Sequence, residues 1–122
     1  VVRNPWDRVI SLYHQLFHKD YGIRTGKSLL FFLEHYRPAP WEHGLQCADY
    51  ADEKMDLVIN FENREEGLRS LESITGVKVD PNKKSRSIDR DKKNYKDYYD
   101  EKTKDIVGRS FARDIELYEY EF

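Results

Sequence analysis

The residues best suited to chemistry lie at the start of the chain. Arg3 follows Val1 and Val2, two β-branched residues typical of the end of a buried strand. Ser11 lies eight residues further on, on the polar face of the helix predicted next. Because open α/β sheets bind ligands at the carboxyl ends of their strands, the position of Arg3 predicts ligand binding through a positive charge. The alternative is that Arg3 only caps the sheet edge or pairs with an acidic side chain.

Two other patterns suggest chemistry but have simpler interpretations. His14 and His18 share a helix face at a spacing that can bind metal, but no cysteine or carboxylate at a matched position completes a site. We therefore predict solvated histidines and no metal. The run over residues 22–28 reads G-I-R-T-G-K-S, with three residues between its glycines where a Walker phosphate loop has four. It also follows a helix instead of a strand, so it predicts a turn into the next helix.

The element that positions Ser11 is a helix beginning at Pro5. Asn4 is a favourable N-cap, and a proline at the first helical position loses no hydrogen bond. Helical spacing predicts one buried face, made of Trp6, Val9, Ile10, Tyr13, Leu16 and Phe17. A short apolar helix over 28–36 should follow, ended by two prolines. The loop over 41–53 either lines a substrate groove or anchors against the core through Trp41, His43, Gln46 and Tyr50.

A second strand and two more helices are predicted downstream. The continuous apolar centre of residues 56–62 is typical of a parallel strand covered on both faces. Asn63 and Glu66 have the spacing of a capping box, so a helix should start there and end at Gly76. Its apolar stripe consists of Leu68, Leu71 and Ile74. A last helix is predicted over 100–118, with inward side chains Ile106, Val107, Phe111 and Leu117.

Composition is typical of a globular protein and argues against several classes. The 122 residues suffice for one domain with a single core. Aromatic residues make up 14% of the chain, and the net charge of −2 argues against a nucleic-acid binder. No apolar run is long enough for a membrane span. Cys47 is the only cysteine, which excludes an internal disulfide. We therefore expect a cytoplasmic, bacterial-like setting in preference to the Golgi lumen.

Three blocks of the chain resemble, in order, the carbohydrate-type (Golgi-type and bacterial) sulfotransferases, which use 3′-phosphoadenosine 5′-phosphosulfate (PAPS). Residues 2–13 read V-R-N-P-W-D-R-V-I-S-L-Y and resemble the family's 3′-phosphate-binding motif. Residues 59–71 read I-N-F-E-N-R-E-E-G-L-R-S-L and resemble its R-F-E-N-L-E-E-D-F segment, with departures at Asn60 and Gly67. The third block, residues 95–122, contains Y-K-D-Y-Y-D-E-K-T and ends D-I-E-L-Y-E-Y-E-F, similar to the family's Y-R-D-Y-Y-D-E-E-T and D-I-E-L-F-G-Y-E-F.

This resemblance implies a fold, a reaction and a site. The fold is the α/β, P-loop-like sulfotransferase fold, a parallel sheet flanked by helices, of which this chain is a helix-rich C-terminal part with few strands. The reaction is in-line transfer of a sulfuryl group from PAPS to an acceptor hydroxyl, by analogy that of a glycan. Arg3 and Ser11 would hold the 3′-phosphate, since a guanidinium can fork onto two phosphate oxygens and a hydroxyl can donate a third bond.

A basic segment adds a second implied contact. Residues 82–93 carry six basic and two acidic side chains, and composition alone favours a solvated surface segment. The resemblance implies instead a lid that closes over the PAPS nucleotide, with Lys83, Lys84 and Arg86 among its contacts. An alternative of another class is a non-catalytic helical module that binds an acidic partner through residues 83–93.

The chain is expected to be only part of a domain. It opens within a strand, which predicts that residues 1–122 are the C-terminal part of a longer sulfotransferase domain. In the family, the 5′-phosphosulfate loop and the usual catalytic base precede the first block. We therefore assign no catalytic residue, with His14 and His43 the only substitutes in view. The isolated fragment is expected to be inactive and to form a homo-oligomer through its uncovered strands.

Overall fold

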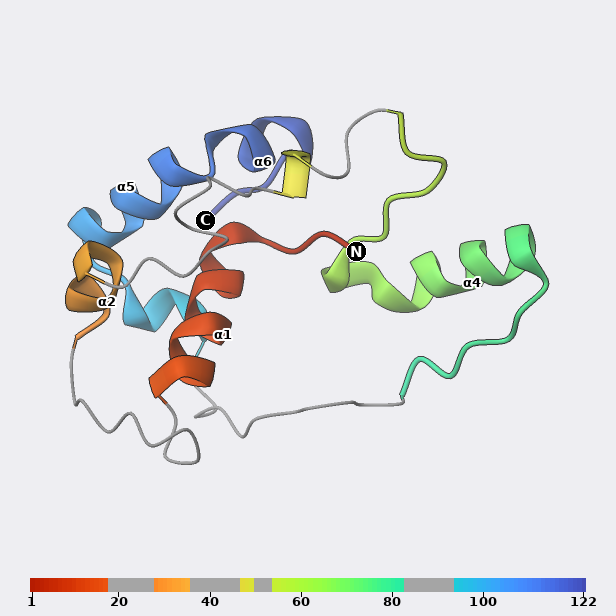
Figure 1. The fold of residues 1–122 in the computed structure, drawn as a ribbon, viewed down its shortest axis with the longest axis horizontal. Coiled ribbons are helices and arrows are strands. Elements are labelled where there is room, and N and C mark those ends of the chain that lie inside the picture. The colour runs from red at the N-terminus through yellow and green to blue at the C-terminus, as the bar shows by residue number, and fades with distance from the viewer. Residues whose placement is uncertain (18–27, 36–46, 50–53, 83–93) are drawn as a thin grey trace.

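The computed structural model describes residues 1–17, 28–35, 47–49, 54–82 and 94–122. Figure 1 shows its helices, which are α1 (Pro5–Phe17), α2 (Leu29–His35), α4 (Arg64–Thr75), α5 (Glu101–Ser110) and α6 (Ala112–Leu117). Short 3₁₀ turns cover Cys47–Asp49, Phe61–Asn63 and Tyr95–Tyr98. The predicted helix-rich character is thereby confirmed. Within these ranges, no helix is long and apolar enough to cross a membrane.

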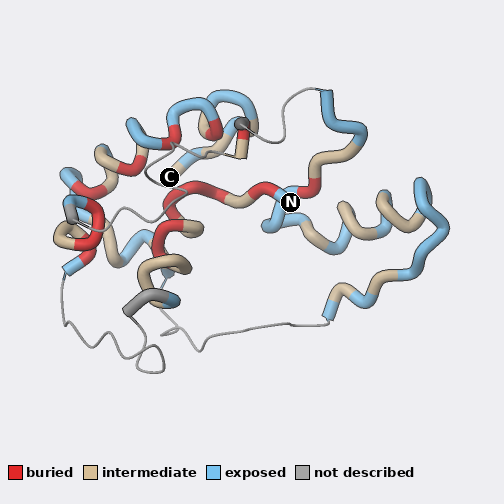
Figure 2. Tube along the Cα trace, in the orientation of Figure 1, coloured by how far each residue is buried: buried red, intermediate tan, exposed pale blue. Residues whose placement is uncertain are grey.

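The hydrophobic core lies where α1 meets α2 and α5. As predicted, Trp6, Val9 and Ile10 form the buried face of α1. The rest of the buried cluster consists of Leu29, Phe32, Leu33, Val107 and Phe111. The Phe122 ring packs edge-on against Trp6, with ring centroids 5.6 Å apart, so the last residue of the chain closes this core. Figure 2 shows that most of the buried residues gather in these elements and few lie along α4.

The two predicted strands meet as one parallel bridge between Val2 and Asn60. The Val2 N–H donates to the Ile59 carbonyl at 2.8 Å, and the Phe61 N–H donates to the Val2 carbonyl at 2.7 Å. No regular strand forms within the described ranges. The prediction of a strand over 56–62 covered on both faces is therefore wrong, because one bridge pairs too few residues and only Ile59 of this segment is buried.

Local sequence signals predicted several helix ends correctly. The Asn4 Oδ1 atom accepts a hydrogen bond from the Trp6 N–H at 3.1 Å and thereby caps α1. Ser28 directly precedes α2, and its Oγ accepts a hydrogen bond from the Phe31 N–H at 3.2 Å. Gly76 ends α4 in the left-handed conformation, with φ of 73°, which a glycine adopts without strain.

Other helix predictions are wrong. Asn63 precedes α4, but its side chain makes no capping hydrogen bond, so the predicted capping box with Glu66 does not form. Asn63 instead closes a 3₁₀ turn, where its N–H donates to the Asn60 carbonyl at 3.1 Å. The predicted last helix is broken at Phe111, whose φ of −118° and ψ of 31° separate α5 from α6. Because the break redirects the chain, Leu117 is 38% exposed instead of facing inward.

Helix α4 packs closely, through a glycine, against the segment that precedes it. A Cβ atom added to Gly67 would lie 2.3 Å from Cγ2 of Ile59, so the helix approaches this residue closely. No residue of α4 is buried, and its predicted stripe is only half-covered at Leu68 and Leu71. Ile74, at the end of the stripe, is 63% exposed. The predicted apolar face of α4 therefore has little cover among the described residues.

Candidate functional site

Arg3 and Ser11, predicted from sequence to act together, are brought together at the start of α1. Arg3 Nη1 donates to Ser11 Oγ at 3.3 Å. The guanidinium also pairs with Asp7: Nε donates to Asp7 Oδ2 at 2.8 Å, and Nη2 lies 2.6 Å from the same oxygen. The alternative prediction, that Arg3 pairs with an acidic side chain, is therefore confirmed. Both side chains reach Arg3 because Asp7 and Ser11 lie on successive turns of one helix face, while ligand binding by Arg3 stays a prediction.

A third contact reaches Arg3 from a distant part of the chain. The Cζ atom of Arg3 lies 4.3 Å from the ring centroid of Phe61, within the range of a cation–π interaction. Phe61 follows the residue that bridges to Val2, so backbone pairing brings the ring to the guanidinium. Sequence reasoning missed this residue, and no local pattern could reveal it, because the pairing joins segments far apart in the chain.

Asn4 joins the three blocks that define the resemblance in the sequence. Its backbone N–H donates to Glu62 Oε1 at 2.8 Å, from the second block. Its Nδ2 donates to the Glu121 carbonyl at 2.9 Å and to the Tyr95 hydroxyl at 3.5 Å, both in the third block. The side chain that caps α1 therefore also fixes residues 59–71 and 95–122 next to Arg3.

Two tyrosines near this junction serve as neutral hydrogen-bond donors. The Tyr99 hydroxyl donates to the Trp6 carbonyl at 2.7 Å, and the Tyr120 hydroxyl donates to Glu62 Oε2 at 3.4 Å. Burial raises the pKa of Tyr99 and of Tyr120 above the ordinary tyrosine value, and nearby carboxylates raise them further. Both phenols are therefore protonated at neutral pH, and their role is to hold the junction together.

His14 has a packing role. Its Nδ1 lies 2.8 Å from the Ile10 carbonyl, which can only accept, so Nδ1 carries the proton. In the neutral ring Nε2 then accepts from the Tyr98 hydroxyl at 3.3 Å. The ring also packs edge-on against Tyr13 and Tyr98, with centroids 5.5 and 5.2 Å away. The prediction of a solvated histidine is wrong for His14, because its position in α1 faces the turn over 95–98. Among the described residues, no group of three ligands could hold a metal ion.

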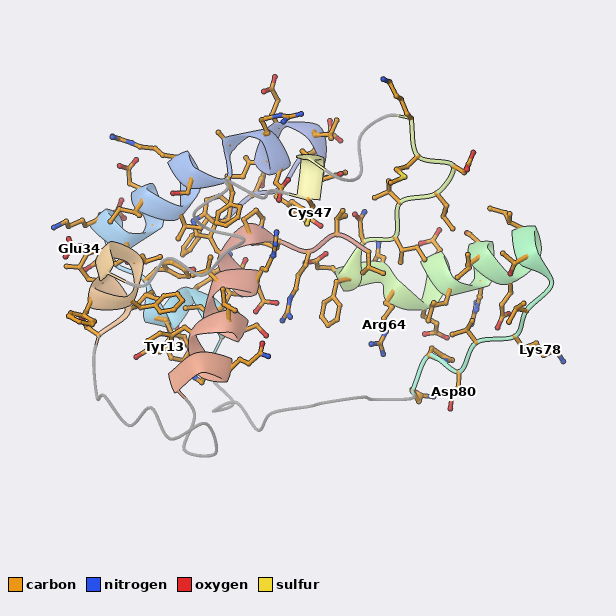
Figure 3. All side chains as sticks on the ribbon, viewed as in Figure 1. Tyr13, Glu34, Cys47, Arg64, Lys78 and Asp80 are labelled. Atoms are coloured by element: carbon orange, nitrogen blue, oxygen red, sulfur yellow. The ribbon has the colours of Figure 1, made fainter. Side chains whose placement is uncertain are left out.

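A second polar cluster anchors the 3₁₀ turn at Cys47, which Figure 3 shows beside α6. Asp114 is fully buried and accepts hydrogen bonds from the N–H groups of Cys47 and Ala48, at 2.9 and 2.6 Å. Arg8 lies 3.8 Å from the same carboxylate and donates to Cys47 Sγ at 3.3 Å. Burial is the main cause that raises the pKa of the Cys47 thiol. The hydrogen bonds from the Cys47 and Ala48 N–H groups to Asp114 give the cluster a structural role.

The remaining predicted site residues lie outside the described residues. They are Lys83, Lys84, Arg86, His18 and His43, together with the loop residues Trp41, Gln46 and Tyr50. The site that the structure describes is therefore the junction around Arg3.

The group at this junction that could bind an anion is the Arg3 guanidinium. A guanidinium carries five N–H donors, and Asp7 and Ser11 engage one on each of its three nitrogens. One N–H remains on each terminal nitrogen, which is the pair that forks onto two oxygens of a phosphate or carboxylate. The side chain of Arg3 is 24% exposed, so a ligand can reach it.

Comparisons with known proteins add no neighbour. No protein-family model, curated protein or solved structure matches the chain.

Proposed function

We propose that this chain is the C-terminal part of a PAPS-dependent sulfotransferase of the carbohydrate type, and that Arg3 and Ser11 bind the 3′-phosphate of the nucleotide. The observation that carries the proposal is the 3.3 Å contact between Arg3 Nη1 and Ser11 Oγ. It places a guanidinium fork and a hydroxyl at one point, as recognition of a tetrahedral dianion requires.

The arrangement of the chain supports the same proposal. The three blocks that resemble the family meet at Asn4, although they are separated by long stretches of sequence. The parallel bridge between Val2 and Asn60 has the strand direction of a P-loop-like parallel sheet. In the proposed complete domain, further parallel strands extend this pair.

Sulfuryl transfer needs positioning and charge neutralisation around the transferred group. In our proposal, Arg3 and Ser11 supply the positioning by holding the far end of the nucleotide, and Lys83, Lys84 and Arg86 cover it. The acceptor is a hydroxyl, by analogy one on a glycan, in a cytoplasmic protein. No described residue is assigned the role of catalytic base.

Calorimetry with two nucleotides tests the assignment. Losing hydrogen bonds to a charged group costs about 1.5–3 kcal/mol, so Arg3→Ala should weaken binding of adenosine 3′,5′-bisphosphate roughly ten- to a hundredfold. Adenosine 5′-phosphate has no 3′-phosphate and should bind both proteins about equally. Arg109→Ala is the matched control, because it removes the same charge from a side chain that is 82% exposed and pairs with Asp105 on its own helix.

Two results would reject the assignment. One is an equal loss of affinity for both nucleotides. The other is bisphosphate binding that Arg3→Ala leaves unchanged and that depends on residues 83–93, as expected for the non-catalytic module with an acidic partner.

A further inference from the structure

Arg3 is held from three directions by side chains of two separate segments. Within the plane of the guanidinium, Asp7 and Ser11 of α1 contact its nitrogens at 2.6 to 3.3 Å. From a third side, the Phe61 ring has its centroid 4.3 Å from Cζ, and Cζ lies over the ring. The contacts with Asp7 and Ser11 only weakly limit tilting of the guanidinium toward solvent, because each of them joins flexible side chains. The Phe61 ring blocks movement of the guanidinium in the remaining direction.

Phe61 is poorly explained by packing alone. It is 38% exposed and does not belong to the buried cluster around α1 and α5. Its backbone, however, is fixed one residue from Arg3, because its N–H donates to the Val2 carbonyl at 2.7 Å. A large apolar ring is thus kept at the surface and attached to the segment that carries the arginine. A second arginine, Arg64, lies 5.8 Å from the same ring centroid and donates to the Pro81 carbonyl.

We propose that Phe61 is a positioning residue for the anion site, and that it holds the Arg3 guanidinium with its two remaining N–H donors directed toward the ligand. This inference rests on the proposed function. A long arginine side chain loses rotamer freedom when it binds, and a side chain ordered in advance loses less of it. The proposal also requires arginine at this position, because a lysine ammonium can lie over the ring but cannot present a fork.

The position of Phe61 also links two parts of the molecule. Arg3 belongs to the segment that enters α1, whereas Phe61 belongs to the segment that enters α4. Figure 3 shows Arg64 at the start of α4, with its side chain extending from the first turn of that helix. Anion affinity should therefore depend on how residues 59–64 are seated against Val2.

Replacing the ring while keeping its volume tests the proposal. Phe61→Leu should weaken binding of adenosine 3′,5′-bisphosphate roughly three- to tenfold, the range expected for a cation–π contact at a partly exposed site. Phe61→Tyr keeps the ring and should bind within about twofold of the parent protein. Val77→Ala is the control. It removes an apolar side chain that is 61% exposed and lies in a different segment from Arg3. Adenosine 5′-phosphate affinity should not change in any variant.

A double variant separates positioning from a structural effect. In an Arg3→Ala background, Phe61→Leu should cost nothing further, because the ring acts only through the guanidinium. A purely structural role would weaken both nucleotides equally, and would persist in that background. Either result, or a tyrosine variant as weak as the leucine variant, overturns the proposal.

A readout without nucleotide keeps this test distinct from that of the proposed function. In the free protein, NMR relaxation of the Arg3 side-chain Nε–H should show greater mobility in Phe61→Leu than in Phe61→Tyr. If the parent protein shows no preference for the 3′-phosphate, the proposed function fails, and this relaxation measurement alone still decides whether Phe61 orders Arg3. Equal mobility in both variants would reject the positioning role.

Discussion

The helices around α1 and the segment around α4 are built in different ways. We refer to residues 1–17, α2 and residues 94–122 as the body, and to residues 54–82 as the arm. The body contains the buried cluster, whereas the arm has Ile59 as its one buried residue. Figure 2 shows this contrast along the chain trace. The body is thus stabilised by apolar burial, and the arm by a small number of specific contacts with the body.

This difference indicates where substitutions should affect the proposed anion site most. The arm meets the body through the bridge at Val2, through Glu62 on Asn4, and through Phe61 on Arg3. These contacts occupy the same few residues as the candidate anion site. Changes deep in the body should therefore affect folding as a whole, while changes at the junction should affect how Arg3 is presented.

The largest contrast should come from removing one apolar side chain in each region. Phe32 in α2 is completely buried, so Phe32→Ala should lower the free energy of unfolding by about 3–5 kcal/mol. Ile74 in α4 is 63% exposed, so Ile74→Ala should change it by less than about 0.5 kcal/mol. Urea unfolding measures both values. A comparable loss at Ile74 would show that the face of α4 is covered in solution.

Two helical glycines compare the packing inside the arm with the packing inside the body. A Cβ at Gly67 would lie 2.3 Å from Ile59 Cγ2, so Gly67→Ala should destabilise the protein by about 1–3 kcal/mol through overpacking. A Cβ at Gly108 in α5 would lie an ordinary 3.5 Å from Trp6, so Gly108→Ala should stabilise it by about 0.5–1 kcal/mol. Thermal unfolding separates the two signs. If alanine has the same effect at both positions, α4 does not pack on Ile59 as described.

The smallest expected effect on stability concerns the N-terminal caps of α5 in the body and α4 in the arm. In the body, Asp100 and Thr103 form a capping box, and the hydrogen bond from the Thr103 N–H is the main cause that lowers the pKa of Asp100. In the arm, Asn63 makes no capping hydrogen bond. A lowered pKa stabilises the fold above the ordinary aspartate value of about 3.9, and this stabilisation is lost as the pH falls through the lowered pKa.

Replacing each cap by alanine measures this difference. Asp100→Ala should lower stability at pH 7 and flatten the dependence of stability on pH below about 4. Asn63→Ala should leave both nearly unchanged. A pH dependence that Asp100→Ala does not alter would mean that the capping box is not formed in solution.

Features set by neighbouring residues could be predicted from sequence, and those set by distant contacts could not. The cap at Asn4, the end of α4 at Gly76 and the buried face of α1 follow from local signals, and all three are confirmed. The Asn63 capping box failed because a preceding 3₁₀ turn, which forms beside the bridge to Val2, sets the backbone there. The break at Phe111 escaped prediction because no proline marks it, although the burial of its ring was predicted correctly.

The candidate site divides in the same way. The resemblance of residues 2–13 to the family's motif paired Arg3 with Ser11, and the long arginine side chain reaches along the face of α1 to the hydroxyl. Phe61 and Glu62 reach the site only through long-range pairing with Val2 and Asn4, which no periodicity in the sequence encodes. The sequence therefore predicted the half of the site that lies on α1 and missed the half that the arm supplies.

The central claim is that Arg3 recognises a phosphate, and its side-chain Nε–H signal tests this most directly. We propose an NMR titration of the ¹⁵N-labelled chain, with the signal assigned by its loss in Arg3→Ala. Adenosine 3′,5′-bisphosphate should shift this signal together with the amides of residues 3–11, while adenosine 5′-phosphate leaves them in place. An Arg3 signal that stays fixed under saturating bisphosphate, while amides of residues 83–93 shift, would contradict the account.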